Sequence, residues 1–141
     1  MIGIFIIAHG TLGESFIQCA KHVLGDNLPL VAHARVTAED DPAVMLPQLQ
    51  QAVRRLDQGD GVLVLTDMYG ATPSNIACRL VEPGKVEAIA GVNLPMLIRA
   101  LSYRGEPLPA MVDKALAGGS NGLVHITREV CSVAATNGSH Q

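Results

Sequence analysis

The sequence predicts a single-domain α/β protein with an open, mostly parallel sheet and helices on both of its faces. Two apolar runs, residues 2–8 and 61–66, have the continuous hydrophobicity of strands that are buried on both sides. Segments between the predicted strands carry apolar residues at helical spacing, and such alternation makes a parallel sheet through right-handed crossovers. The 141 residues, 48% hydrophobic and 16% charged, suit one domain with a sizeable core. For a chain of this size we expect the strand order 2-1-3-4.

The same composition excludes several classes of protein. The formal net charge is −3 and no basic cluster occurs, so nucleic acid is not expected as a partner. The apolar runs are too short to span a bilayer, and the first one lacks the basic leader and cleavage site of a signal peptide. The three cysteines, Cys19, Cys78 and Cys131, lie far apart and form no CxxC motif. We therefore expect buried, reduced thiols in a cytoplasmic protein, with no metal and no cofactor.

The first half of the chain gives two strands and two helices. The first strand ends abruptly at His9, and a helix follows over residues 14–24, with Gly25 as its stop. Residues 29–36 are the second strand. Acidic capping residues and a proline at the first helical position then begin a helix that runs over residues 42–58.

The third strand, residues 61–67, is apolar until it ends at the carboxylate of Asp67. A turn leads from it into a helix over residues 73–81. Residues 86–90 are the fourth strand, and a further helix lies between residues 91 and 105. The ends of the first and third strands therefore carry a histidine and an aspartate.

The last part of the chain is expected to hold a helix, a link and an edge strand. The helix covers residues 108–117, and the Gly-rich residues 118–122 are predicted to be a flexible link. Residues 123–127 form a short strand at an edge of the sheet, and residues 128–141 form a mobile tail. The predicted domain is thus residues 1–127.

His9 and Asp67 are predicted to be neighbours, although they are far apart in the sequence. With the order 2-1-3-4, the direction in which strands are added to the sheet reverses between the first and third strands. A crevice opens at the carboxyl ends of these two strands. A neutral imidazole is a good nucleophile near pH 7. A carboxylate bound to one ring nitrogen fixes the tautomer, leaves the other nitrogen free and stabilises positive charge on the ring. The pair is thus suited to nucleophilic catalysis.

Four further residues are candidates for binding an anion beside this pair. Thr72 and Ser74 lie where a helix begins, and a helix start offers unpaired N–H groups and the positive end of the dipole. Gly10 allows a close approach of the backbone, and Thr11 adds a hydroxyl. Together with His9 and Asp67, these residues are the equipment for holding a phosphoryl group on a histidine.

Each of these features also has an ordinary structural interpretation. A lone histidine after a strand is more often structural, an aspartate there is often a cap, and a Thr-Pro-Ser-Asn run is a common helix start. We interpret the site as functional because all three coincide at one predicted crevice. The other histidines have no visible partner and are assigned no role: they are His22, His33, His125 and His140.

Other classes of protein fit the pattern less well. A receiver domain needs acidic residues at the end of the first strand, where this chain has Ala8 and His9. A small metal chelatase needs a second histidine at the crevice, which the third and fourth strands do not supply. A histidine phosphatase needs an arginine before His9. A non-enzymatic binding module would keep the anion site without needing a free imidazole.

Three motifs resemble the EIIA component of the mannose family of the bacterial sugar phosphotransferase system. They are IIxAHGxxxxS, then VLVLTDMYGATPSNIA, then GVNLPMLIRAL, and the resemblance runs from Ile2 to about Val124. Residues 70–72 read Gly-Ala-Thr where many members have Gly-Gly-Ser, a change that should keep the backbone donors.

The resemblance implies a phosphotransferase in which His9 accepts phosphate from phospho-HPr through Nε2, while Asp67 binds Nδ1. His9 would then pass the phosphate to an EIIB protein, which must be a separate chain, or to a regulatory target in an incomplete system. Members are usually homodimers that often exchange an edge strand, for which the segment after Gly122 is the candidate. Contact with the membrane is implied through partners alone. The alternative is a phosphodonor subunit for a dihydroxyacetone kinase, which resembles the same family.

Overall fold

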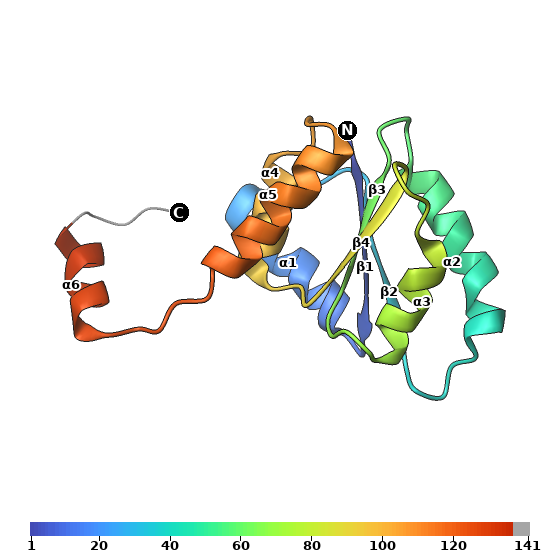
Figure 1. The fold of residues 1–141 in the computed structure, drawn as a ribbon, viewed down its shortest axis with the longest axis horizontal. Coiled ribbons are helices and arrows are strands. Elements are labelled where there is room, and N and C mark those ends of the chain that lie inside the picture. The colour runs from blue at the N-terminus through green and yellow to red at the C-terminus, as the bar shows by residue number, and fades with distance from the viewer. Residues whose placement is uncertain (137–141) are drawn as a thin grey trace.

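The computed structural model describes residues 1–136 and contains one open sheet of four parallel strands. The strands are β1 (Gly3–His9), β2 (Val31–Val36), β3 (Val62–Thr66) and β4 (Val86–Ala90), in the order β2-β1-β3-β4. This confirms the predicted fold class and strand order (Figure 1). The central strands β1 and β3 are buried along their whole length except at His9. The first residue to leave the core is therefore the candidate nucleophile.

Five helices cover the two faces of this sheet (Figure 1). One face carries α1 (Leu12–Leu24), α4 (Leu94–Ser102) and α5 (Leu108–Asn121). The other carries α2 (Pro42–Leu56) and α3 (Thr72–Leu80).

The sequence of β1 explains why both faces need a cover. Ile4 and Ile6 pack toward α1, α4 and α5, whereas Phe5 and Ile7 pack toward α2 and α3. Successive side chains of a strand point to opposite faces, so an uninterrupted apolar strand requires helices on both.

The helices begin close to where their capping residues predict. The side chain of Asp41 accepts a hydrogen bond from Ala43 N–H at 3.0 Å, at the start of α2. Asn93 Oδ1 accepts one from Met96 N–H at 2.9 Å, at the start of α4. Asn93 also donates from Nδ2 to the carbonyl of Gly119 at 3.0 Å, which ties α4 to the end of α5.

The prediction of a flexible link at residues 118–122 is wrong, because α5 continues to Asn121. Gly118 and Gly119 are buried against α4. A Cβ at Gly118 would lie 2.7 Å from the Cβ of Arg99, so the missing side chains let the two helices approach closely. Burial of α5 outweighs the helix-propensity cost of about 1 kcal/mol for each glycine.

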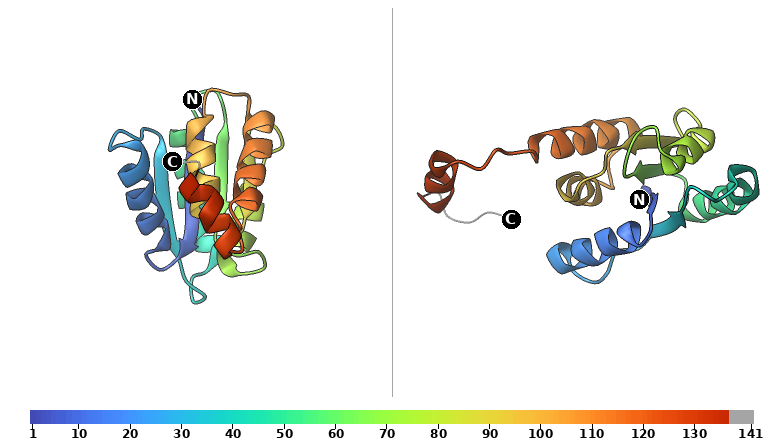
Figure 2. Two further views of the ribbon diagram at one scale, coloured as in Figure 1. Left: turned by 90° about the vertical axis from the view of Figure 1, so that its left-hand side faces the viewer. Right: turned by 90° about the horizontal axis from the view of Figure 1, so that it is seen from below.

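The predicted strand at residues 123–127 does not form within the described chain. These residues leave the end of α5 and extend away from the body of the molecule, as Figures 1 and 2 show. The side chain of Leu123 is 79% exposed and that of Ile126 is 73% exposed. A strand needs a neighbour to receive its backbone hydrogen bonds, and this segment has none beside it in the single chain.

The expected mobile tail is in part a helix, α6 (Arg128–Thr136). Thr127 begins it, since its Oγ1 accepts from Val130 N–H at 3.2 Å and its carbonyl accepts from Cys131 N–H at 3.0 Å. The rest of the predicted tail, residues 137–141, lies outside the described residues.

The cysteines differ from the prediction in one respect. Cys19, Cys78 and Cys131 are free, but all three are exposed instead of buried. Among residues 1–136, no cluster of three or more metal-ligating side chains occurs. No helix in the same part of the chain is long and apolar enough to cross a membrane.

Candidate functional site

The fold brings His9 and Asp67 into direct contact at the carboxyl edge of the sheet. β1 and β3 are hydrogen-bonded neighbours with Ile7 opposite Thr66, so the residues that follow emerge side by side. The Nδ1 atom of His9 lies 2.7 Å from Oδ2 of Asp67. The backbone N–H of His9 donates to the same oxygen at 3.0 Å. The aspartate therefore holds both the ring and the main chain of the histidine.

The environment of Asp67 keeps its carboxyl group ionised. Its side chain is 12% exposed, and burial alone would raise its pKa. The hydrogen bonds from the backbone and ring of His9, together with the charge of that ring, outweigh burial and hold the pKa of Asp67 below its ordinary value. An ionised carboxylate can only accept a hydrogen bond, so the proton of His9 resides on Nδ1. In the neutral form of His9 the lone pair of Nε2 is then available, on a side chain that is 45% exposed.

Gly10 and Thr11 lie directly beyond His9, as the sequence indicates. Gly10 has a φ of +53°, a left-handed conformation that turns the chain sharply after β1. Thr11 is the N-cap of α1, but its side chain makes no capping hydrogen bond. The start of α1 therefore follows His9 closely in the chain and has no side-chain acceptor for its N–H groups.

Thr72 and Ser74 belong to the first turn of α3, which follows Asp67 through a short loop. The N-cap of α3 is Ala71, which offers no capping oxygen, so this helix start is also without a side-chain acceptor. Ser74 differs from the expectation in its surroundings. It is 4% exposed, and its hydroxyl is hydrogen-bonded to Gly70 and Ala71 within the loop. The hydroxyl of Ser74 is therefore buried and bonded to the protein's own backbone.

Sequence reasoning missed the apolar surroundings of the site. Large apolar side chains follow both His9 and Asp67 and remain exposed: Leu12 is 40%, Met68 is 58% and Tyr69 is 82% exposed. We call these three residues the apolar rim. Two large hydrophobic residues directly after a predicted catalytic aspartate are the signal that could have indicated it. Exposed apolar groups beside a reactive atom are typical of a surface that meets another protein.

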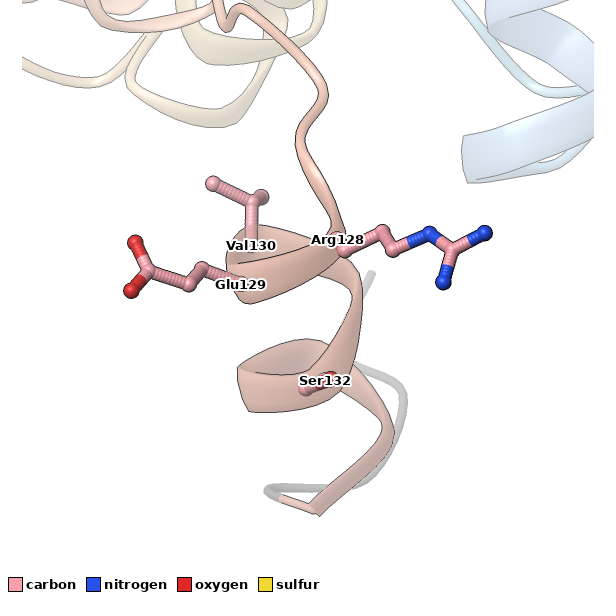
Figure 3. A pocket seen from close by; sticks show the side chains of 4 residues that line it. All are labelled: Arg128, Glu129, Val130 and Ser132. Carbon is pink, nitrogen blue, oxygen red and sulfur yellow. The ribbon is translucent and has the colours of Figure 1, made fainter.

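Of two hollows in the described residues, one lies next to the candidate site and the other does not. A cavity of about 160 Å³ between α3 and β4 is lined in part by Thr66, Tyr69 and Ser74, so it lies beneath the loop that carries Asp67. A second hollow is lined by Arg128, Glu129, Val130 and Ser132 of α6 (Figure 3), and none of the candidate site residues lines it. There Arg128 and Glu129 point in opposite directions, so the charged groups do not converge on a ligand.

Comparisons with known proteins agree with this geometry. Residues 3–116 match the family model described as the PTS system fructose IIA component. The PTS system mannose-specific EIIAB component of Escherichia coli K12 is 32% identical over 106 residues, which are 74% of this chain and 32% of that protein. The chain thus spans about a third of the length of that relative.

Two shorter proteins match over more of their length. The PTS system fructose-specific EIIA component of Bacillus subtilis is 30% identical over 105 residues, which are 74% of this chain and 71% of that protein. The crystal structure of the phosphotransferase system component EIIA from Streptococcus agalactiae superposes with a TM-score of 0.77 at 28% identity. It covers 89% of this chain and 97% of that one.

Proposed function

The chain belongs to the EIIA family of the sugar phosphotransferase system, mannose type, and from that premise we propose that it is a phosphocarrier acting through His9. In this proposal His9 accepts a phosphoryl group from phospho-HPr and passes it to an EIIB protein. The observation that carries the proposal is the 2.7 Å contact between His9 Nδ1 and Asp67, which leaves Nε2 as the free, exposed nucleophile.

The chemistry of the transfer needs no proton to move. Nε2 of neutral His9 attacks the phosphorus, a new N–P bond forms, and the N–P bond to the histidine of the donor breaks with its electron pair leaving on that nitrogen. The proton stays on Nδ1, so positive charge develops on the ring of His9. The carboxylate of Asp67 lies against that charge and stabilises it. In the transfer to the acceptor, a nucleophile of the acceptor attacks the phosphorus. The N–P bond to His9 then breaks, with its electron pair left on Nε2.

The phosphoryl oxygens need donors, and the two helix starts beside His9 supply candidates. Neither α1 nor α3 has a side-chain cap, so the N–H groups of their first turns can receive an anion. In the proposal, the backbone at Gly10 and Thr11 and the hydroxyls of Thr11 and Thr72 approach the phosphoryl group from these two sides. A direct contact from Ser74 would require its hydroxyl to leave its partners in the loop.

The apolar rim supports protein partners in preference to small molecules. A partner protein that carries a phosphohistidine can place an apolar surface against Leu12, Met68 and Tyr69. A small phosphate donor has no such surface. Both the donor and the acceptor would use this surface, one after the other. With such partners we expect the protein in the cytoplasm, in contact with the membrane only through its acceptor.

We also propose that the protein is a homodimer with an exchanged edge strand. The outer edge of β4 has no neighbouring strand among the described residues. Residues 123–127 are extended and expose apolar side chains, so they suit a fifth strand on the β4 edge of a second copy.

The phosphocarrier proposal is tested by incubating the protein with phosphoenolpyruvate, EI and HPr. We expect an acid-labile, alkali-stable phosphoprotein, as for a phosphohistidine, and no label in His9→Gln. His22→Gln is the matched control, since His22 is an exposed histidine on α1 with no contact to Asp67. An alkali-labile phosphate, or label retained in His9→Gln, would contradict the proposal.

A further inference from the structure

The loop between Asp67 and α3 is closed by the hydroxyl of Ser74. Ser74 is the third residue of α3, and its Oγ accepts a hydrogen bond from the backbone N–H of Gly70 at 2.8 Å. The same hydroxyl donates to the carbonyl of Ala71 at 3.0 Å. That carbonyl also accepts the N–H of Asn75 at 3.0 Å, the first hydrogen bond of the helix. One buried hydroxyl therefore joins the first turn of α3 to the two residues before it.

This arrangement replaces an ordinary N-cap. A Ser, Thr, Asp or Asn at the N-cap normally bonds the N–H groups of the first turn, but Ala71 has no oxygen to do so. Ser74 instead reaches back from the third position of the helix, as the Glu or Gln of a capping box does, but it accepts from Gly70 N–H, one residue before the N-cap. Since its hydroxyl bonds the loop, the N–H groups of the first turn keep no side-chain acceptor. The loop is fixed, and the end of the helix stays open for an anion.

Packing contributes little to holding this loop. Met68 and Tyr69 are 58% and 82% exposed, and a Cβ at Gly70 would meet no atom within 4 Å. The cavity of about 160 Å³ lies beneath the loop. Gly70 also has a φ of +89°, which most residues avoid, so the turn must be held by its partners. Hydrogen bonds at the two ends of the loop are what fix it. At one end His9 donates to Asp67, and at the other Ser74 Oγ accepts from Gly70 N–H and donates to the carbonyl of Ala71.

We propose that Ser74 is a positioning residue for phosphoryl transfer. Its two hydrogen bonds fix the loop so that Asp67 stays in contact with His9 and the open start of α3 stays beside the phosphoryl group. This inference rests on the proposed phosphocarrier function and assigns Ser74 no contact with the phosphate. It replaces the direct role that the sequence suggested for this hydroxyl.

The test compares Ser74→Thr with Ser74→Val, two side chains of the same shape that differ in the hydroxyl. Both add a methyl group next to the cavity, so any effect of added bulk is common to them. We expect Ser74→Thr to accept phosphate from phospho-HPr near the wild-type rate. Ser74→Val should lose roughly 10- to 100-fold in maximal rate, because a misplaced catalytic group costs about that much. The concentration of donor for half-maximal rate should change little. Ser74→Ala, which adds no bulk, should behave like the valine variant.

A second measurement separates positioning from direct contact. The nitrogen chemical shifts of the His9 ring report which nitrogen carries the proton, and they need no phosphate. We expect one fixed tautomer in the wild type and Ser74→Thr, and a mixture in Ser74→Val. Equal rates in the threonine and valine variants would overturn the proposal. So would a slow valine variant that keeps the wild-type tautomer, since that result indicates a direct ligand. If the wild type accepts no phosphate, the proposed function fails, and the tautomer comparison still decides the role of Ser74.

Discussion

At the scale of single residues, the decisive feature is that one oxygen of Asp67 holds both the ring and the backbone of His9. The ring contact is 2.7 Å and the backbone contact is 3.0 Å. A residue that served only as a helix cap would bond the N–H groups of α3, whereas this carboxylate points across to the neighbouring strand. The position of Asp67 therefore argues for a role in orienting the imidazole.

We expect Asp67→Asn to slow phosphoryl transfer to His9 by roughly 10- to 1,000-fold, which is about 1.4 to 4 kcal/mol of barrier. Asparagine carries no charge to stabilise the ring, and its amide can donate to Nδ1 and so favour the wrong tautomer. The same change in serine proteases costs about 10⁴-fold, but there a proton must be moved. The measurement is the initial rate with phospho-HPr, with Asp113→Asn, an exposed aspartate of α5, as the control.

The same variant should change how stability depends on pH. The pKa of Asp67 is lowered in the folded state, so its contribution is fully present above the ordinary value of 3.8 and is lost as pH falls through the folded-state pKa. The difference in unfolding free energy between wild type and Asp67→Asn, from denaturant titrations, should be larger at pH 6 than in strong acid. A variant with a wild-type transfer rate and a constant stability difference would reduce Asp67 to a structural residue.

The contact between His9 and Asp67 could be predicted from the sequence, whereas the hydrogen bonds of Ser74 to its own loop could not. An apolar strand that stops at His9 or Asp67 indicates the edge of the sheet, and the strand order makes the two neighbours. A serine in the first turn of a helix has the same sequence signature whether it binds a ligand or its own loop. The backbone positions of Gly70 and Ala71 show that the hydroxyl bonds its own loop. The spacing of residues in the sequence does not predict those positions.

At the scale of the elements, the strands were easier to predict than the end of α5. β4 has the predicted bounds, and the helices on both faces follow from the apolar patterns of the strands. The pair Gly118 and Gly119 indicated a link because glycine weakens an isolated helix. In the folded protein these glycines are where α5 contacts α4, so tertiary packing overrides their local preference.

We expect Gly118→Ala to destabilise the protein by roughly 1 to 3 kcal/mol, because overpacking costs about that much. In an isolated helix the same change would stabilise by about 1 kcal/mol, so the sign of the effect tests the contact. The new Cβ would lie 2.7 Å from the Cβ of Arg99, which cannot rotate away. Urea unfolding measures the change, with Ser120→Ala, exposed in the same turn, as a nearly neutral control. A stabilised Gly118→Ala would show that α4 and α5 are not in this contact.

At the scale of the whole molecule, the two ends of the sheet are built differently. At the amino edge, the buried Arg104 donates from Nε to the carbonyl of Ile2 at 2.9 Å and from a terminal nitrogen to that of Leu30 at 3.0 Å. Burial lowers the pKa of Arg104, and its two hydrogen bonds to backbone carbonyls join the residue before β1 to the residue before β2. At the carboxyl edge, α1 and α3 begin without side-chain caps. Side-chain hydrogen bonds of Arg104 thus close one edge, whereas the helix starts at the other edge keep no side-chain cap.

The exchanged strand is the prediction that belongs to this scale. In the single chain, Leu123, Val124 and Ile126 are 79%, 57% and 73% exposed, and the backbone groups along the outer edge of β4 have no strand beside them. Exposed apolar side chains are unfavourable in water, and an unpaired strand edge is open to a further strand. Pairing residues 123–127 with β4 of a second copy removes both features at once. Asn93 holds the end of α5 through Gly119, which fixes the point from which the segment leaves. We therefore expect a dimer at micromolar concentration, measured by light scattering.

Shortening the chain to residues 1–122 should give a monomer that still folds, because the sheet, both clusters of core residues and the contact between His9 and Asp67 lie within it. Ile126→Asp in the full chain should weaken the dimer in the same direction, since it places a charge among apolar groups at the new interface. Arg128→Ala, exposed on α6 just beyond the segment, is the control and should leave the dimer intact.

If the shortened chain is still a dimer, the copies associate through another surface. If the full chain is a monomer, residues 123–127 do not pair with a second copy, and the proposed exchange of strands is wrong. Phosphate acceptance by the shortened chain then separates assembly from the proposed chemistry, because His9 and Asp67 are in contact within one chain.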